Sequence, residues 1–315
     1  MYNHIYSIVE DFVKAVEQEK RYSFFLEHWN GKRGPKRRLS IAQVISLNLL
    51  RFTIHVKDLK AFHRIVKVMD LIPDMPNYEN FLKASNKAFP LLTAFMQLLL
   101  LQNQRNNESH VHFIDSTPVS TCLNRRIFNH RVTKDFATRG KSTKGWFYGF
   151  KLHGVCSEKG ALEAVAFTSG NVHDSKMVEQ VTKNLKGSFF CDAGYLKNSK
   201  ELVELANSGR FIYAATRQNM NRLMSGEQWE YLRKRNIIES DWGVLKQNYF
   251  LEYHQARSMV GLFRHYVCCI SAYILECRLK SFPRIKTRLS GYLEYSPMNE
   301  KLGGGCQRAP TDAEL

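Results

Sequence analysis

The sequence predicts an α/β fold in which a mixed five-stranded sheet is flanked by helices and preceded by an all-helical N-terminal domain. Three observations support this prediction. Apolar residues recur at helical spacing through the first 105 residues. Three strand-like runs then follow one another between residues 111 and 170 without an intervening helix. After them, short apolar strands alternate with helical segments, which is typical of parallel crossover connections.

The N-terminal domain, residues 1–105, begins its helices with recognisable signals. In "LSIAQVISLNLLRF" the apolar side chains recur on one face, and Ser40 can cap the helix. Ahead of it, "GKRGPKRR" (residues 31–38) holds five basic residues in eight. This run is either a solvated loop or an arm that contacts DNA phosphates, with Arg37 and Arg38 as candidate contacts. We favour neither reading over the other.

The second domain, residues 106–282, has the element order three strands, helix, strand, helix, strand, helix. That is the order of the ribonuclease H-like fold. A polar and strongly basic insert at residues 120–145 separates the first two strands, and a segment of that length inside a domain is usually functional or disordered. We expect one long helix over residues 227–250. Residues 283–315 lack an apolar period, so we expect a disordered tail there.

Composition points to a nucleic-acid partner. The formal net charge is +17 and the sequence pI is about 9.6, which favours binding to a polyanion, either nucleic acid or an acidic membrane surface. Seven cysteines without a C-x-x-C pair argue against a disulfide framework or a zinc ribbon, and for a reducing compartment. The longest apolar run, near residues 89–102, is too short to cross a bilayer. We therefore expect a cytoplasmic protein without a membrane partner.

Two predicted strands end in an acid, "HFID" at Asp115 and "FFCD" at Asp192. If these strands pair in parallel, both carboxylates lie at one edge of the sheet, a few ångströms apart. Like charges that close destabilise each other, so a cation between them is favoured. Glu239 lies on the helix expected over residues 227–250, beside an apolar stripe that would pack this helix on the sheet. Singly, each aspartate is adequately explained as a turn residue, and Glu239 as a surface acid.

Taken jointly, the three acids favour a metal site. Carboxylate oxygens are the ligands that Mg²⁺ and Mn²⁺ prefer, and two such ions can activate a water or hydroxyl for phosphoryl transfer. We predict Asp115, Asp192 and Glu239 as catalytic residues and metal ligands. Arg235 and Lys246 lie on the same strip of the helix as Glu239, where they could meet phosphate. Further candidate DNA contacts lie in the basic insert: Arg125, Arg126, Arg131, Lys141 and Lys144.

Several other residues were weighed and set aside. His153 and His173 could position a substrate, but a structural role is favoured for each. Asp174 is explained as a helix cap. Trp146 and Trp242 could stack on a flipped base, but a place in the core is favoured for both.

Five motifs resemble those of the DDE transposases of bacterial insertion sequences, in particular the insertion-sequence group numbered 982. They are "FIDSTPV", "KSTKGWFYGFKLHGV", "FTSGNVHDSK", "FFCDAGY" and "RNIIESDWGVLK", and the resemblance covers roughly residues 40 to 282. The family's tyrosine, expected three residues before Arg235, is replaced by Leu232, with Tyr231 one residue earlier.

The resemblance implies a ribonuclease H-like recombinase that binds the inverted repeats of its element, hydrolyses a strand to expose a 3′-hydroxyl and joins it to target DNA. It implies that Asp115, Asp192 and Glu239 hold the metal ions and that Lys246 contacts DNA near the cleaved end. It also implies a homo-oligomer on double-stranded DNA. The alternatives are a catalytically silent DNA-binding regulator derived from a transposase and another metal-dependent nuclease of the same fold.

Overall fold

The computed structural model describes residues 1–19, 22, 24–27, 29, 37–143, 145–215 and 224–281. The chain divides into two compact units, one formed by Met1–Leu99 together with the chain from Asn248 onward, the other by Leu100–Gln247. Residues 248–281 thus group with the N-terminal helices, whereas the sequence analysis placed them with the sheet. The predicted tail at residues 283–315 lies outside the described residues, and so does residue 144.

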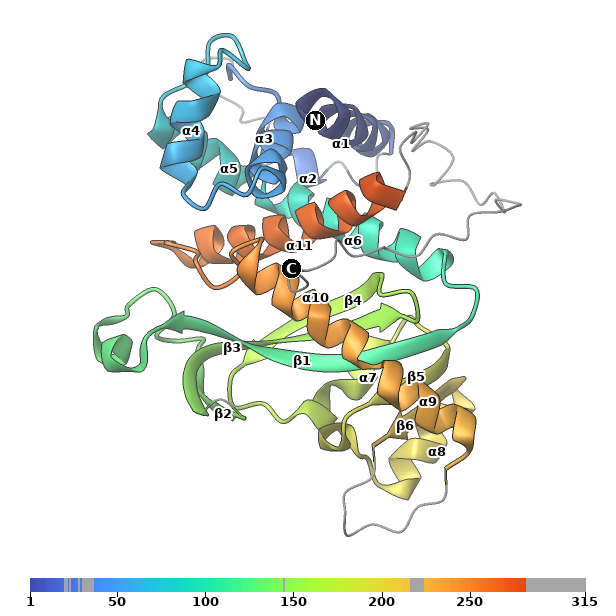
Figure 1. Ribbon diagram of the computed structural model, residues 1–315. Helices are drawn as coiled ribbons and strands as arrows, with labels where there is room; N and C mark the ends of the chain where they lie inside the picture. The colour runs from blue at the N-terminus through green and yellow to red at the C-terminus, as the bar shows by residue number, and fades with distance from the viewer. Residues whose placement is uncertain are drawn as a thin grey trace, which may run out of the picture. The chain divides into compact units, whose positions relative to one another are not determined.

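The first unit is helical (Figure 1). Its α3 begins at the cap expected at Ser40, which forms a capping box: the Ser40 side chain accepts from the N–H of Gln43, and the Gln43 side chain accepts from the N–H of Ser40. The helices are α1 (Tyr2–Gln18), α2 (Phe24–Glu27), α3 (Ile41–Thr53), α4 (Leu59–Val68), α5 (Tyr78–Lys87), α6 (Phe89–Arg105), which continues into the second unit, and α11 (Met259–Ser281).

Helix α11 packs on α3 through buried polar contacts as well as apolar ones. Arg51 Nη2 lies 3.2 Å from His265 Nδ1, and Arg264 donates to the Asn48 side chain. Met259–Arg278 has the length and hydropathy of a membrane span, but 78% of its most apolar window is buried inside the structure. That burial matches the expectation of a largely buried helix, and it is what a core helix shows.

The second unit is built on a sheet with the path β2-β3-β1-β5-β6, in which β4 also pairs with β3. The strands are β1 (Val111–Cys122), β2 (Thr138–Ser142), β3 (Gly145–Ser157), β4 (Leu162–Ser169), β5 (Gly187–Cys191) and β6 (Arg210–Ala214). The helical segments are η2 (Asn124–Asn129), η3 (Asp174–Met177), α7 (Val178–Thr182), η4 (Ala193–Tyr195), α8 (Ser199–Asn207), α9 (Gly226–Lys234) and α10 (Asn236–Gln247).

The sheet is mixed, as predicted. β1 pairs antiparallel with β3, and β3 pairs antiparallel with both β2 and β4, whereas β1, β5 and β6 run parallel. The number of strands differs from the prediction, because the structure shows a six-stranded sheet instead of a five-stranded one. The additional strand β2 lies inside the basic insert and forms a hairpin with the start of β3, a pairing that the polar composition of the insert concealed.

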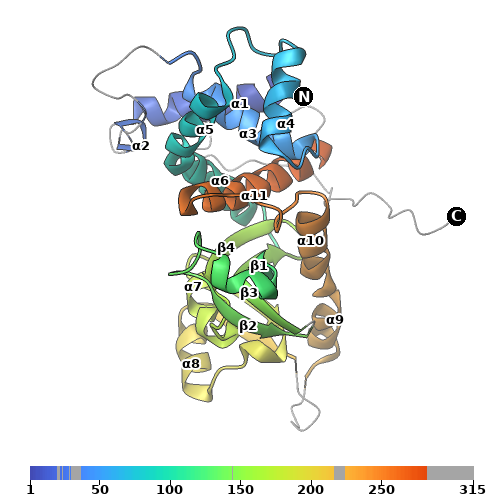
Figure 2. The same ribbon diagram turned by 90° about the vertical axis from the view of Figure 1, so that its left-hand side faces the viewer.

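Helices cover both faces of this sheet, with α7 and α8 on one side and α9 and α10 on the other (Figure 2). Side chains alternate accordingly along the strands. Ile114 and Cys191 join the buried cluster that includes Val178 of α7. On the other face, the ring of Phe190 packs 5.0 Å from that of Tyr231 in α9. Cys191 therefore lies in the core, on the face opposite Phe190.

Two predicted helices are broken in the structure. The helix expected over residues 227–250 is divided into α9 and α10, with Arg235 between them. The segment after residue 173 forms the short η3 and then α7. Both breaks fall where a charged side chain contacts β1. Arg235 lies beside Asp115, and Asp174 accepts a hydrogen bond from Ser116.

Candidate active site

Asp115 and Asp192 lie at the same edge of the sheet because β1 and β5 run parallel. Ile114 is the register partner of Cys191, so the next residue on each strand is the aspartate. Asp115 is largely buried and continues β1, whereas Asp192 is exposed and its carboxylate accepts from the N–H of Ala193 at 2.8 Å. The two side chains share the α9–α10 face of the sheet.

Trp242 of α10 contacts Asp115 directly. Its indole Nε1 donates to Asp115 Oδ2 at 3.2 Å. The ring fits there because Gly154, the register partner of Asp115 on β3, has no side chain. A Cβ at Gly154 would lie 2.4 Å from Trp242 Cη2. Trp242 is buried, as expected for its apolar stripe, yet its polar edge also touches the candidate site.

Arg235, in the break between α9 and α10, connects two of the three predicted acids. Its Nη1 lies 3.5 Å from Asp115 Oδ1 and its Nη2 lies 3.0 Å from Glu239 Oε1. The carboxylates of Asp115 and Glu239 thus flank one guanidinium. The sequence analysis predicted that Arg235 meets phosphate, and in the structure its charge is directed at these acids.

Burial raises the pKa of Asp115 to about 7, even though the Arg235 charge and the N–H of Ser116 act in the opposite direction. The nearby charge of Glu239 raises it further. One guanidinium therefore leaves the negative charge at this edge of the sheet incompletely compensated. A site with this deficit favours an additional cation.

The donor set fits a hard divalent cation by its chemistry. All three predicted ligands offer carboxylate oxygens, which suit Mg²⁺ or Mn²⁺ better than soft metals. Within the described part of the chain, no three His, Cys, Asp or Glu side chains are gathered closely enough to hold a metal ion. Asp192 directly follows β5, the strand that pairs with β1 and its Asp115. Glu239 and Asp115 are joined by their shared contact with the Arg235 guanidinium.

A second polar cluster lies on the opposite face of β1, directly behind Asp115. Ser116 donates to Asp174 Oδ1 at 2.9 Å, and Lys151 Nζ donates to the same oxygen at 3.1 Å. The expected capping role of Asp174 is wrong, because His173 caps η3 by accepting from the N–H of Ser175. The Asp174 carboxylate is instead engaged with β1 and β3.

His153 is a buried member of this cluster. Its Nε2 lies 2.9 Å from Thr168 Oγ1, and its Nδ1 lies 3.8 Å from Asp174 Oδ1. Burial lowers the pKa of His153 to about 4, although the Asp174 charge opposes that shift. The imidazole is therefore neutral at pH 7, which agrees with the structural role favoured for it.

The predicted DNA contacts fall into three groups. Lys246 is half-buried and donates to the backbone carbonyl of Pro118, so it supports β1. In the insert, Arg125, Arg126, Arg131 and Lys141 are all exposed. Lys144 lies outside the described residues.

In the helical unit, Arg37 and Arg38 are exposed. The guanidinium of Arg37 lies 4.3 Å from the ring centroid of Trp29. The rest of the basic run, at residues 31–36, is not among the described residues.

Sequence reasoning missed the close approach of Gly154 and Trp242 beside Asp115, and it placed Trp146 wrongly. It did not connect Gly154 with Trp242, although a glycine opposite a strand aspartate is a signal of close approach. The core position favoured for Trp146 is wrong, because 63% of that residue is exposed. Trp146 is the second residue of β3 and lies outside the core. At such a position the alternation of residues along a strand does not distinguish a buried aromatic side chain from an exposed one.

Comparison with known proteins gives one match. The search of curated proteins and the search of solved structures found none. Residues 105–259 match a family model described as "Transposase DDE domain", a region that contains Asp115, Asp192 and Glu239. The match covers just under half of the chain and lies over the sheet unit. It supports a DDE transposase and thereby indicates a DNA-binding, DNA-transferring enzyme.

Proposed function

We propose that the protein is the transposase of a bacterial insertion sequence, of the group numbered 982, with a ribonuclease H-like catalytic domain. It would cleave a DNA strand at the end of its element and join the new 3′-hydroxyl to target DNA. The observation that supports this proposal is the placement of Asp115 and Asp192 on the neighbouring parallel strands β1 and β5, with Glu239 joined to Asp115 through Arg235. These residues lie inside the region that matches the transposase domain.

In this proposal Asp115, Asp192 and Glu239 hold two Mg²⁺ or Mn²⁺ ions. When bound, these ions would activate the attacking water or hydroxyl and stabilise the leaving oxygen. Trp242 fixes Asp115 through its N–H, which leaves Oδ1 directed towards Arg235. Arg235 restrains the Glu239 carboxylate on the same side of the sheet.

DNA recognition is assigned to the basic surfaces. The helical domain at residues 1–105 would bind the inverted repeats, with Arg37 and Arg38 on phosphate. The exposed arginines and lysines of the insert would hold the end near the catalytic edge. Lys246 would contact DNA near the cleaved end after release from the Pro118 carbonyl. The protein would act as a homo-oligomer on double-stranded DNA in the bacterial cytoplasm.

The test uses a labelled DNA end from the element's own flank, with Mg²⁺. Wild-type protein should nick this end and join it to a plasmid, whereas Asp192→Asn and Glu239→Gln should bind the end normally and produce neither product. Glu204→Gln is the matched control, because Glu204 is an exposed acid on α8, on the other face of the sheet. Equal products from the wild type and Asp192→Asn would refute the site assignment.

A second candidate is a DNA-binding protein without catalysis. It is favoured by the Arg235 bridge, which neutralises part of the charge of Asp115 and Glu239 with no metal. The same assay separates the two candidates. Specific binding of the end without any nick, in either Mg²⁺ or Mn²⁺, would support the silent protein.

A further inference from the structure

The basic insert presents exposed aromatic side chains together with its cations. We define the hairpin arm as the described residues 123–143 and 145–146, which include η2, β2 and the first residues of β3. On this arm 90% of Phe128 and 63% of Trp146 is exposed, and Phe136 and Leu123 are exposed as well. Single exposed apolar residues are ordinary, but a group of them on one projecting arm indicates a binding surface.

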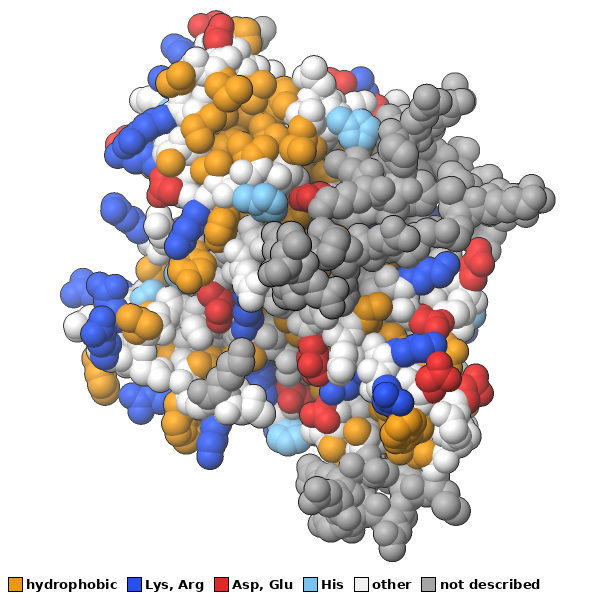
Figure 3. Space-filling model, in the orientation of Figure 1, with side chains coloured by type: hydrophobic (Ala, Val, Ile, Leu, Met, Phe, Trp, Pro, Cys, Tyr) orange, Lys and Arg blue, Asp and Glu red, His pale blue; other side chains and the backbone are white. Residues whose placement is uncertain are grey.

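The charge of the hairpin arm is strongly one-sided. The sequence of residues 123–146 holds seven lysines and arginines and a single acid, Asp135. In Figure 3, Lys and Arg side chains gather with hydrophobic ones between them at the left of the molecule, over the η2 end of the sheet unit. A surface with this charge attracts polyanions and repels basic partners.

The register of the hairpin places cations and aromatic rings on one face. Lys141 on β2 is the direct partner of Trp146 on β3, and its Nζ lies 5.9 Å from the Trp146 ring centroid. Arg139 points to the same face of β2, and its guanidinium carbon lies 5.9 Å from the centroid of Phe128. The exposed rings of Phe128 and Trp146 therefore each have a cation 5.9 Å from the ring centroid.

The opposite face of the hairpin fixes this arrangement. Gly140 is buried, and a Cβ there would lie 2.3 Å from the backbone oxygen of Gly170 at the end of β4. β2 therefore packs closely against the sheet. Asn124 donates to the carbonyl of Trp146 at 2.7 Å, which ties the start of η2 to the same strand. The aromatic rings are presented on a backbone that is already ordered.

We propose that the hairpin arm binds unpaired bases of single-stranded DNA, with Trp146 and Phe128 as stacking platforms and Arg139 and Lys141 on the neighbouring phosphates. Every base offers a π-face, so stacking tolerates any sequence, and an adjacent cationic surface follows the backbone. Paired bases inside a duplex do not expose their faces, so the aromatic rings would be useful only where a strand is frayed or displaced.

This inference rests on the proposed function and extends it, because a strand cleaved at the end of the element leaves terminal nucleotides that can fray. The partner would be the unpaired nucleotides next to the cleaved end. The DNA duplex itself would be held by phosphate contacts alone. Loss of the rings should therefore affect single strands and leave duplex binding nearly unchanged.

The experiment measures binding of the full-length protein by fluorescence anisotropy to a labelled oligothymidylate of about 20 nucleotides and to a duplex of the same length. Trp146→Ala and Phe128→Ala should each weaken single-strand binding about tenfold and change duplex binding less than about twofold. Trp229→Ala is the matched control, because Trp229 on α9 is 55% exposed and has the Arg233 guanidinium carbon 4.8 Å from its ring.

Two results would overturn the proposal. One is a loss of single-strand binding in Trp146→Ala no larger than in Trp229→Ala. The other is an equal loss for single strand and duplex, which would mean that the hairpin arm binds phosphate only. Both outcomes are independent of cleavage. The Asp192→Asn variant should bind single strands as tightly as the wild type does. A failure of the catalytic proposal would therefore appear in the nicking assay, and a failure of the single-strand proposal would appear in the binding assay.

Discussion

Asp115 is the residue whose surroundings say most about the site. Trp242 and Arg235 both contact it, yet burial dominates and its pKa rises to about 7. A strand aspartate chosen for stability alone would be placed in water, where its ionised form is solvated. The structure instead presents a poorly compensated carboxylate at a fixed place, which is what a metal ligand needs.

The first prediction concerns Asp115→Asn and pH, in buffer with a metal chelator. The folded-state pKa lies near 7 and the unfolded value near 3.8. Between these values the folded protein binds more protons than the unfolded one, so the wild-type free energy of unfolding falls as the pH rises. The full shift corresponds to about 4 kcal/mol as an upper bound.

Asp115→Asn keeps the shape of the side chain and removes the charge. It should raise the melting temperature at pH 8 by several degrees and leave it almost unchanged at pH 4, in thermal denaturation followed by circular dichroism. A melting temperature at pH 8 equal to or below that of the wild type would show that burial does not destabilise the ionised Asp115.

The second prediction concerns Gly154→Ala. Its Cβ would overlap Trp242, so the indole must move away from Asp115. We expect a loss of about 1–3 kcal/mol in the free energy of unfolding, and a drop in strand cleavage. Gly243→Ala on α10 is the control, since nothing lies within 4 Å of a Cβ there and alanine favours a helix. A wild-type cleavage rate in folded Gly154→Ala would contradict the positioning of Asp115 by Trp242.

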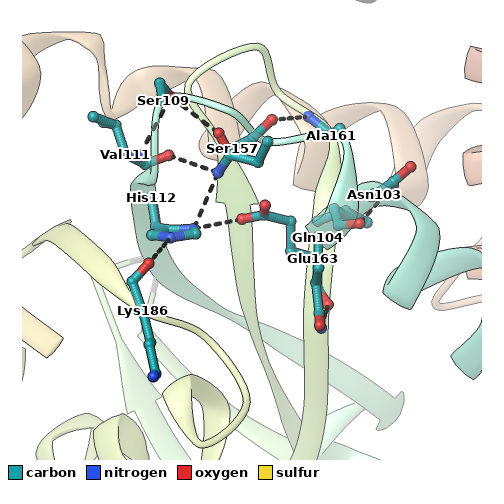
Figure 4. Close-up of polar contacts among 11 residues, drawn as sticks. Asn103, Gln104, Ser109, Val111, His112, Ser157, Ala161, Glu163 and Lys186 are labelled. Atoms are coloured by element: carbon teal, nitrogen blue, oxygen red, sulfur yellow. Dashed lines mark hydrogen bonds and ion pairs between the residues drawn. The ribbon is translucent and has the colours of Figure 1, made fainter. Parts of the chain in front are cut away.

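At the scale of elements, β1 organises the sheet unit. It carries Asp115 on one face and Ser116 on the other, and it is held at its start by a buried His–Glu contact. His112 Nδ1 lies 2.6 Å from Glu163 Oε2 of β4, and His112 Nε2 lies 2.9 Å from the carbonyl oxygen of Lys186 (Figure 4). These contacts join β1, β4 and the segment before β5 at the end of the sheet away from Asp115.

The third prediction concerns this pair. Glu163→Ala leaves the buried His112 without its carboxylate and should cost about 3–5 kcal/mol in the free energy of unfolding by urea. The double variant His112→Phe with Glu163→Leu should cost clearly less, because neither side chain leaves a buried polar partner unpaired and a ring is retained beside Phe189.

The matched comparison is Glu158→Ala, which removes a partly exposed pair with Lys234 at 3.5 Å and should cost less than about 1 kcal/mol. If Glu163→Ala is no more destabilising than Glu158→Ala, the buried pair does not anchor β1.

The sequence predicted local features of the elements well. Ser40 caps its helix as expected, and the structure shows a full capping box there and another at Asn198, because each needs only residues three positions apart. Gly209 follows α8 with a φ of 79°, as expected for a helix stop. β5 ends at Cys191, directly before Asp192, as its short apolar run predicts. The strand end predicted at Asp115 is wrong, because pairing with β3 continues β1 to Cys122.

Features that depend on distant partners were not predictable. β2 is polar and becomes a strand only by pairing with β3. The break at Arg235 and the engagement of Asp174 both depend on β1, which lies more than 50 residues away in the chain. Trp146 has the composition of a core residue and is exposed because its hairpin extends past the helices. A single sequence contains the residues of these contacts but not their pairing.

At the scale of the whole molecule, the basic net charge and the acidic edge of the sheet unit act on DNA in opposite directions. A net charge of +17 would hold a DNA duplex through its phosphates, with an affinity that falls steeply with salt. The acidic edge of the sheet unit would by itself repel the same phosphates. A bound divalent cation removes this conflict, since it neutralises the carboxylates and offers coordination sites to the DNA.

The central claim, that Asp115, Asp192 and Glu239 form one divalent-metal site, is tested most directly by titrating Mn²⁺ into the protein bound to its DNA end, with free Mn²⁺ followed by electron paramagnetic resonance. The wild type should bind about two ions. Asp115→Asn, Asp192→Asn and Glu239→Gln should each weaken Mn²⁺ binding at least about tenfold, and Glu204→Gln should match the wild type. Wild-type Mn²⁺ binding in all three variants would contradict the claim.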